Sequence, residues 1–91
     1  MEDRFTAWLR ANGYRQPSAI GDEVFGYLAD LVYRLDGGAG AAIFFTDEDL
    51  EAHDVIRDEG WSVIKIGPGD NWQHVVNKWP SVFGSKEEGN L

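Results

Sequence analysis

The sequence contains no cysteine among its 91 residues. This absence excludes disulfide bonds, thiolate metal ligands and a cysteine nucleophile at once. No apolar run approaches the roughly 20 residues that a membrane-spanning helix needs, so no contact with a membrane is expected. Because the opening residues (MEDRFTAWLR) hold acids and bases and no apolar stretch, no signal peptide is expected, and the expected location is the cytoplasm.

Basic residues are also few, since eight lysines and arginines face sixteen acids and the net charge is −8. A dedicated nucleic-acid binder is usually basic because it must neutralise phosphates, so only weak or indirect contact with nucleic acid is expected. The acids concentrate between residues 47 and 59. Residues 1–15 instead hold Arg4, Arg10 and Arg15, which are therefore the candidate residues for any nucleic-acid contact.

Aromatic residues are what the chain has in quantity, with four Trp, five Phe and three Tyr. Each aromatic side chain buries a large area, so these residues, the tryptophans included, are expected to form the core. The length allows one domain. We expect that domain over residues 1–84, followed by a flexible polar tail at residues 85–91.

The spacing of apolar and turn residues predicts alternating helices and strands. The expected helices are 2–12, 47–59 and 71–79, and the expected strands are 27–35, 41–46 and 61–66. Thr46 and Asp49 resemble a capping box at the start of the second helix. Residues 20–35 fit two interpretations, an amphipathic helix or a strand that forms a hairpin with residues 41–46 across a glycine-rich turn.

Several short motifs resemble those of one protein family. They are Phe5-x-x-Trp8-Leu9, Gly60-Trp61 followed by Val63-Ile64-Lys65-Ile66, then Asp70-x-Trp72, and Pro80-Ser81-Val82-Phe83-Gly84. Together they resemble the degenerate nuclease-type domain found at the C-terminus of bacterial and archaeal superfamily 2 helicases, including defence-associated ones. That domain is similar to PD-(D/E)xK restriction endonucleases and to very-short-patch-repair nucleases. The resemblance covers roughly residues 5–84 and favours the hairpin. It implies a restriction-endonuclease-like α/β fold, with a three-to-four-stranded mixed sheet and flanking helices.

The resemblance also implies where a catalytic site would stand. In the family, an Asp on one strand and an acid on the next hold Mg²⁺. Asp30 matches the first position, Phe45 stands at the second, and Asp47 matches the final position. Because phenylalanine cannot bind a metal, we expect no catalysis, no metal and no cofactor, with Asp30 and Asp47 as vestigial positions. For Asp30, the simpler expectation is an ion pair with Arg34.

Three functions remain open. The first is a catalytically inactive nuclease-like accessory module that binds a protein partner, such as a subunit of a helicase or anti-phage defence complex. The second is a divergent metal-dependent DNA endonuclease, and the third is an acidic regulator or DNA-mimic inhibitor. The candidate partner-binding residues are Glu51, Asp54 and Asp58, whose charges would complement a basic surface.

The two histidines carry no supporting pattern. His53 and His74 fall on separate predicted helices, without the neighbours that a metal site or a general acid and base would need. Both are therefore expected to be ordinary surface residues.

Overall fold

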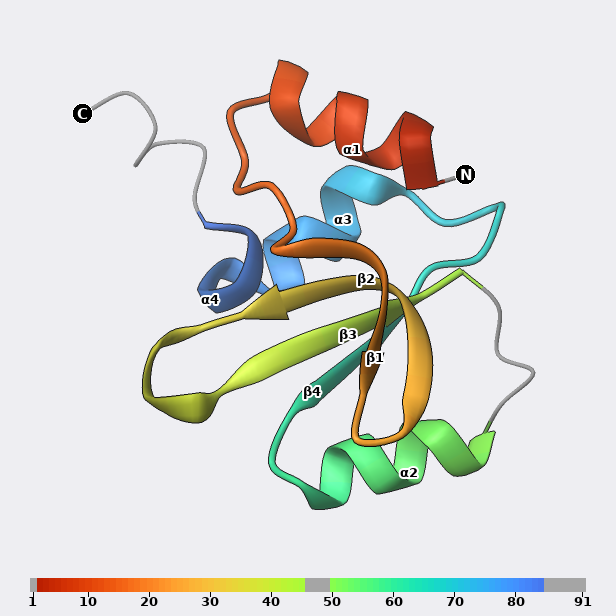
Figure 1. The fold of residues 1–91 in the computed structure, drawn as a ribbon. Coiled ribbons are helices and arrows are strands. Elements are labelled where there is room, and N and C mark those ends of the chain that lie inside the picture. Colours follow the sequence, from red (N-terminus) through yellow and green to blue (C-terminus); the bar gives the residue numbers. More distant parts are fainter. Residues whose placement is uncertain (1, 46–49, 85–91) are drawn as a thin grey trace.

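The computed structural model describes residues 2–45 and 50–84 (Figure 1). The elements run in the order α1 (Glu2–Ala11), β1 (Ala19–Val24), β2 (Tyr27–Arg34), the 3-10 turn η1 (Asp36–Gly38), β3 (Gly40–Phe44), α2 (Leu50–Asp58), β4 (Ser62–Lys65), α3 (Trp72–Lys78) and α4 (Pro80–Phe83). Asp47, the predicted cap at Thr46 and Asp49, and the expected tail at residues 85–91 lie outside the described residues.

The four strands form one mixed sheet in the order β1-β2-β3-β4. The pairs β1/β2 and β2/β3 are antiparallel, while β4 runs parallel to β3 after the crossover through α2. Helices α1, α3 and α4 lie on one side of the sheet and α2 lies on the other (Figure 1). The predicted α/β architecture, with a small mixed sheet and flanking helices, is thereby confirmed. None of the described helices is long and apolar enough to cross a membrane.

The hairpin interpretation of residues 27–46 is confirmed, because β2 and β3 pair in antiparallel register. The sequence did not predict β1, which pairs with β2 through a two-residue turn at Phe25 and Gly26. Both turn residues have positive φ, 50° and 88°, as the tight turns of twisted hairpins require. The ring of Phe25 meets that of Trp61 edge-on, with centroids 5.4 Å apart, and this contact holds the hairpin tip near the start of β4.

The core has two halves, one on each face of the sheet. Under α1, α3 and α4 lies a cluster rich in aromatic residues, which includes Phe5, Tyr33, Phe45 and Phe83. Under α2 lies a smaller aliphatic cluster around Ala42, Val63 and Ile56, with Phe44 at its edge. Trp8, Trp72 and Trp79 are partly buried against the first cluster and Trp61 against the second, so the tryptophans contribute to the core as predicted.

The segment after α1 is tied to the sheet and to α4. The hydroxyl of Tyr33 donates to the carbonyl oxygen of Arg15 at 2.7 Å, and the Arg15 guanidinium donates to the carbonyl oxygens of Ser81 and Val82. Burial raises the pKa of Tyr33, an effect that the nearby Arg15 charge partly opposes. These bonds fix the chain between α1 and β1 against the C-terminal end of the described domain.

The indole ring of Trp61 lies against the start of β3. A Cβ atom built on Gly40 would come within 2.5 Å of this ring, so only glycine fits there without a shift of the indole. The Trp61 Nε1 also donates to the carbonyl oxygen of Gly38 at 3.2 Å. The Trp61 side chain therefore links the β2–β3 connection to the start of β4.

Candidate functional site

Asp30, in the middle of β2, lies beside Phe45, the residue that directly follows β3. The register pairs Leu31 with Ile43, and an Asp30 carboxylate oxygen accepts a hydrogen bond from the Phe45 backbone N–H at 2.9 Å. The structure thus brings together the first two of the three positions that the family resemblance singles out, while the third, Asp47, lies outside the described residues. The carboxylate satisfies the backbone N–H that follows the last residue of β3.

The expected ion pair between Asp30 and Arg34 is wrong. Arg34 instead contacts Asp22 of β1, with 3.0 Å between the guanidinium nitrogen and the carboxylate oxygen. The backbone N–H of Glu23 and the Arg34 guanidinium both hold the pKa of Asp22 below its usual value. The physical reason for the error is that β1 was not predicted, so Asp22 was not available as a partner.

The strand alternation is interrupted at Asp30. Ala29 and Val32 both face the cluster under α2, whereas Leu31 between them faces the aromatic cluster. Residues three apart on a regular strand would point to opposite faces. Gly21, which lies across the hairpin from Asp30, has a φ of 66°. The strand therefore twists at Asp30, and its carboxylate points toward the end of β3 instead of following the regular alternation of side chains.

Phe45 points into the aromatic cluster. Its side chain is 9% exposed, and its ring meets that of Phe5 edge-on with centroids 5.9 Å apart. Within residues 2–45 and 50–84, no group of three or more His, Cys, Asp or Glu side chains could hold a metal ion. In the part of the chain that is described, Asp30 is therefore a single half-buried carboxylate that a backbone N–H already engages.

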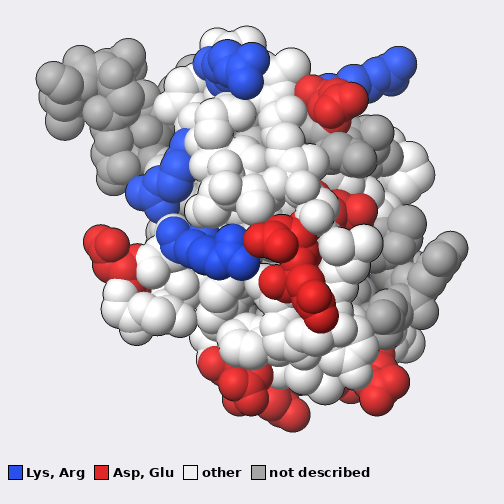
Figure 2. All heavy atoms as spheres, in the orientation of Figure 1, with Lys and Arg blue, Asp and Glu red and all other residues white. Residues whose placement is uncertain are grey.

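The acidic residues of α2 form one exposed stripe. Glu51, Asp54 and Asp58 follow at i, i+3 and i+7, and all three are exposed. On the opposite side of the helix, Ala52, His53 and Ile56 are buried against the sheet. Arg57 adds one base beside the stripe, 3.6 Å from a carboxylate oxygen of Asp54. In Figure 2, some acidic side chains lie along the lower edge of the molecule, where Figure 1 places α2, and others lie at the centre and on the left.

The three candidate arginines do not form one patch. Arg4 and Arg10 are exposed on α1, and six residues at about 100° each place them on different sides of that helix. Arg15 lies beyond α1 and is bonded to α4, next to a shallow pocket that it shares with Arg34, Leu35, Asp36 and Ser81. The basic side chains visible in Figure 2 are accordingly spread over the upper and left parts of the molecule.

His53 is buried, contrary to the sequence prediction. Its side chain is only 1% exposed, and its ring lies 4.5 Å from that of Phe44. The periodicity of α2 explains the error, because His53 falls between Ala52 and Ile56 on the inward side. His74 is exposed on α3, as predicted.

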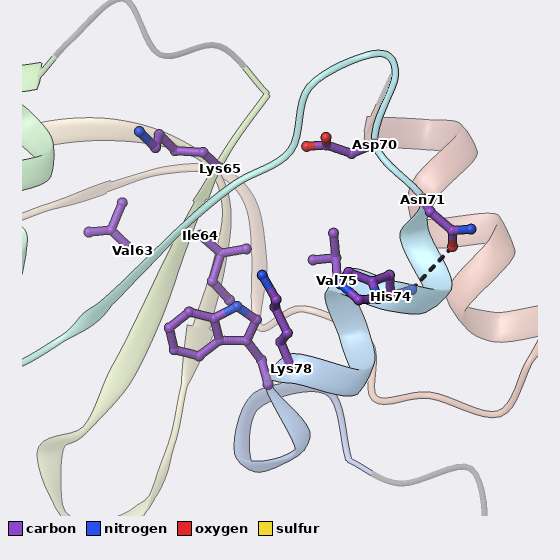
Figure 3. Close-up of a pocket in the computed structure, with 9 residues that line it drawn as sticks. Val63, Ile64, Lys65, Asp70, Asn71, His74, Val75 and Lys78 are labelled. Carbon is purple, nitrogen blue, oxygen red and sulfur yellow. Dashed lines mark hydrogen bonds between the residues drawn. The ribbon is translucent and has the colours of Figure 1, made fainter.

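A groove between β4 and α3 was not anticipated from the sequence. Its volume is about 280 Å³, and its lining residues are Val63, Ile64, Lys65, Asp70, Asn71, His74, Val75, Lys78 and Trp79 (Figure 3). The Asn71 side chain accepts a hydrogen bond from the His74 backbone N–H at 3.1 Å, which caps α3. The alternating pattern of residues 61–66 did predict the strand. Nothing in that pattern could show which elements would lie beside it.

In comparisons with known proteins, no family model, no curated protein and no solved structure matches this chain.

Proposed function

We propose that this chain is a catalytically inactive, nuclease-like accessory module that acts by binding a protein partner, such as a subunit of a helicase or anti-phage defence complex. The contact between Asp30 and Phe45 carries the proposal. In the resembled family, these two strand positions hold the metal. Here they are neighbours, but a buried aromatic ring stands where the second carboxylate would be.

The chemistry explains why this arrangement favours an inactive module. Phosphodiester cleavage of the resembled type needs a hard cation, which oxygen ligands from several groups hold next to an activated water. Asp30 offers one carboxylate, and one of its oxygens already accepts the Phe45 N–H. The restriction-endonuclease-like assignment of the fold belongs to the same proposal, since both rest on the motifs and on this strand geometry.

Titration with Mg²⁺ or Mn²⁺ should therefore give only weak heats that added salt suppresses. Supercoiled and linear DNA should remain intact in the presence of either cation. The matched variant is Asp30→Asn. It should give the same weak heats of cation binding as the native chain, because Asp30 holds no ion. A stoichiometric site of micromolar affinity that this substitution abolishes would favour the divergent endonuclease instead.

The acidic stripe of α2 is the proposed contact with a basic partner. Reversing Glu51, Asp54 and Asp58 to lysine should slow association about tenfold or more at low salt, because complementary charges act mainly on the association rate. The partner recovered from the native host by affinity purification serves as the ligand in the kinetic measurement.

A second triple variant supplies the control for this charge reversal. Asp3, Glu23 and Asp36 are also exposed acids, but none of them belongs to α2, so their reversal to lysine should have a much smaller effect. Equal rates for the two triple variants would mean that only net charge matters. Competition between the chain and duplex DNA for the partner would favour the acidic regulator.

A further inference from the structure

Strand β4 forms one edge of the sheet, because β3 is its only strand neighbour in the described parts of the chain. Alternate residues of a parallel strand bond to the neighbouring strand. Since the Ile66 N–H donates to the Phe44 carbonyl oxygen, Ile64 has the same orientation toward β3. The backbone N–H and C=O groups of Val63 and Lys65 therefore point to the open side, where they can pair with another strand.

The groove between β4 and α3 runs beside this open edge (Figure 3). Ile64, Val75 and Trp79 give the groove an apolar part. Lys65 on β4 and Lys78 on α3 give it a basic rim, and the His74 ring lies one turn before Lys78.

The groove differs in charge from the chain as a whole. Two lysines and a histidine line it, and its one acid, Asp70, already accepts the Gly67 N–H at 2.7 Å. The chain carries a net charge of −8. The groove would thus attract an acidic segment that most of the remaining surface repels.

We propose that the open edge of β4 binds an extended acidic segment of a partner protein by strand addition. The backbone of the segment would pair with Val63 and Lys65, and an apolar side chain would enter the groove. Successive side chains of an added strand alternate between its two faces. In Figure 3, Lys65 extends from β4 away from α3, whereas Lys78 extends from α3 toward β4, so carboxylates on either face would meet a lysine.

A peptide fits this edge better than a nucleic acid does. The sugar-phosphate backbone has no N–H groups to donate to the strand carbonyls, so phosphates could use only the lysines. The residues of this edge and groove are different from those of the α2 stripe and of the Asp30–Phe45 contact. The peptide-binding test can therefore succeed or fail whatever the outcome of the tests of the proposed function.

The test uses a synthetic octapeptide of alternating glutamate and valine, with amide NMR spectra of the native chain as readout. Binding should shift the amide signals of Val63 and Lys65 and slow their hydrogen exchange. Reversing Lys65 and Lys78 to glutamate should weaken the affinity by about tenfold, the scale expected of two exposed ion pairs. The matched control is reversal of Arg4 and Arg10 on α1, which should leave the affinity unchanged.

Comparing Lys65→Pro with Lys65→Ala separates the contribution of backbone pairing from that of the lysine charge. Lys65→Ala removes the lysine alone, whereas Lys65→Pro also removes the N–H that points to the open edge. Proline is tolerated at such a position of an edge strand, so both variants should fold. We expect Lys65→Pro to bind the peptide several-fold more weakly than Lys65→Ala, and equal affinities would contradict strand addition.

Three further outcomes would overturn the inference. The first is equal binding of an octapeptide of alternating lysine and valine. The second is a set of shifts at β4 that a single-stranded oligonucleotide causes but the acidic peptide does not. The third is self-association of the chain through this edge in a form that excludes the peptide. The triple α2 variant should bind the octapeptide like the native chain.

Discussion

Replacing Phe5 with alanine should lower the free energy of unfolding by about 3–5 kcal/mol, the range for large aromatic truncations in a core. Phe5 is fully buried, and its ring centroid lies between 5.3 and 6.1 Å from those of Trp8, Phe45, Trp72 and Phe83. A small domain has only about 5–15 kcal/mol in total, so this loss is a large fraction of the stability and should lower the midpoint of unfolding strongly.

Urea denaturation followed by tryptophan fluorescence measures the loss, since two of the tryptophans lie against Phe5. Phe25→Ala is the matched control, because it is the same chemical change at a side chain that is 43% exposed. Among residues 2–45 and 50–84, its ring contacts that of Trp61 alone, so we expect a loss of about 1 kcal/mol. Equal losses at the two positions would show that the aromatic cluster does not dominate stability.

Gly40→Ala should destabilise the domain by about 1–3 kcal/mol, the usual range for overpacking. The added methyl group would lie 2.5–2.6 Å from three ring atoms of Trp61, and the bond from the indole to Gly38 limits its freedom to move. Thermal and urea denaturation both report the change.

Gly69→Ala is the control for this substitution, because a Cβ atom there meets nothing within 4 Å. In a double variant with Trp61→Leu, the alanine should cost much less, since the smaller side chain removes the clash. An undiminished cost in that background would mean that the strain arises in the backbone of β3.

The periodic segments of the sequence predicted α1, α2, α3, β3 and β4, whereas the choice of a strand for residues 27–35 rested on the family resemblance. Helix α1 repeats apolar residues at helical spacing, and the alternating residues before Ile66 gave β4. Strand β1 was missed because its sequence, AIGDEV, contains a glycine and two acids and is stabilised by pairing with β2. Its turn places a positive φ on Phe25, a residue type that does not signal such a turn.

Predictions about sites depended on knowing which elements are neighbours. The adjacency of Asp30 and Phe45 followed from treating residues 27–46 as a hairpin. The partner of Arg34 could not be found, because Asp22 lies on the strand that was missed. The groove beside β4 could not be predicted either, because it depends on the order of the strands and on the packing of α3 beside β4. Local sequence patterns carry no information on these tertiary contacts.

The contact between the rings of Phe45 and Phe5 also constrains how this sequence can evolve. A change of Phe45 to an acid would take one ring out of the aromatic cluster and put a charge in its place, among buried apolar side chains. Such a protein would be less stable before any gain in metal binding could offset the loss. A metal site built at this position would therefore need compensating substitutions around Phe5.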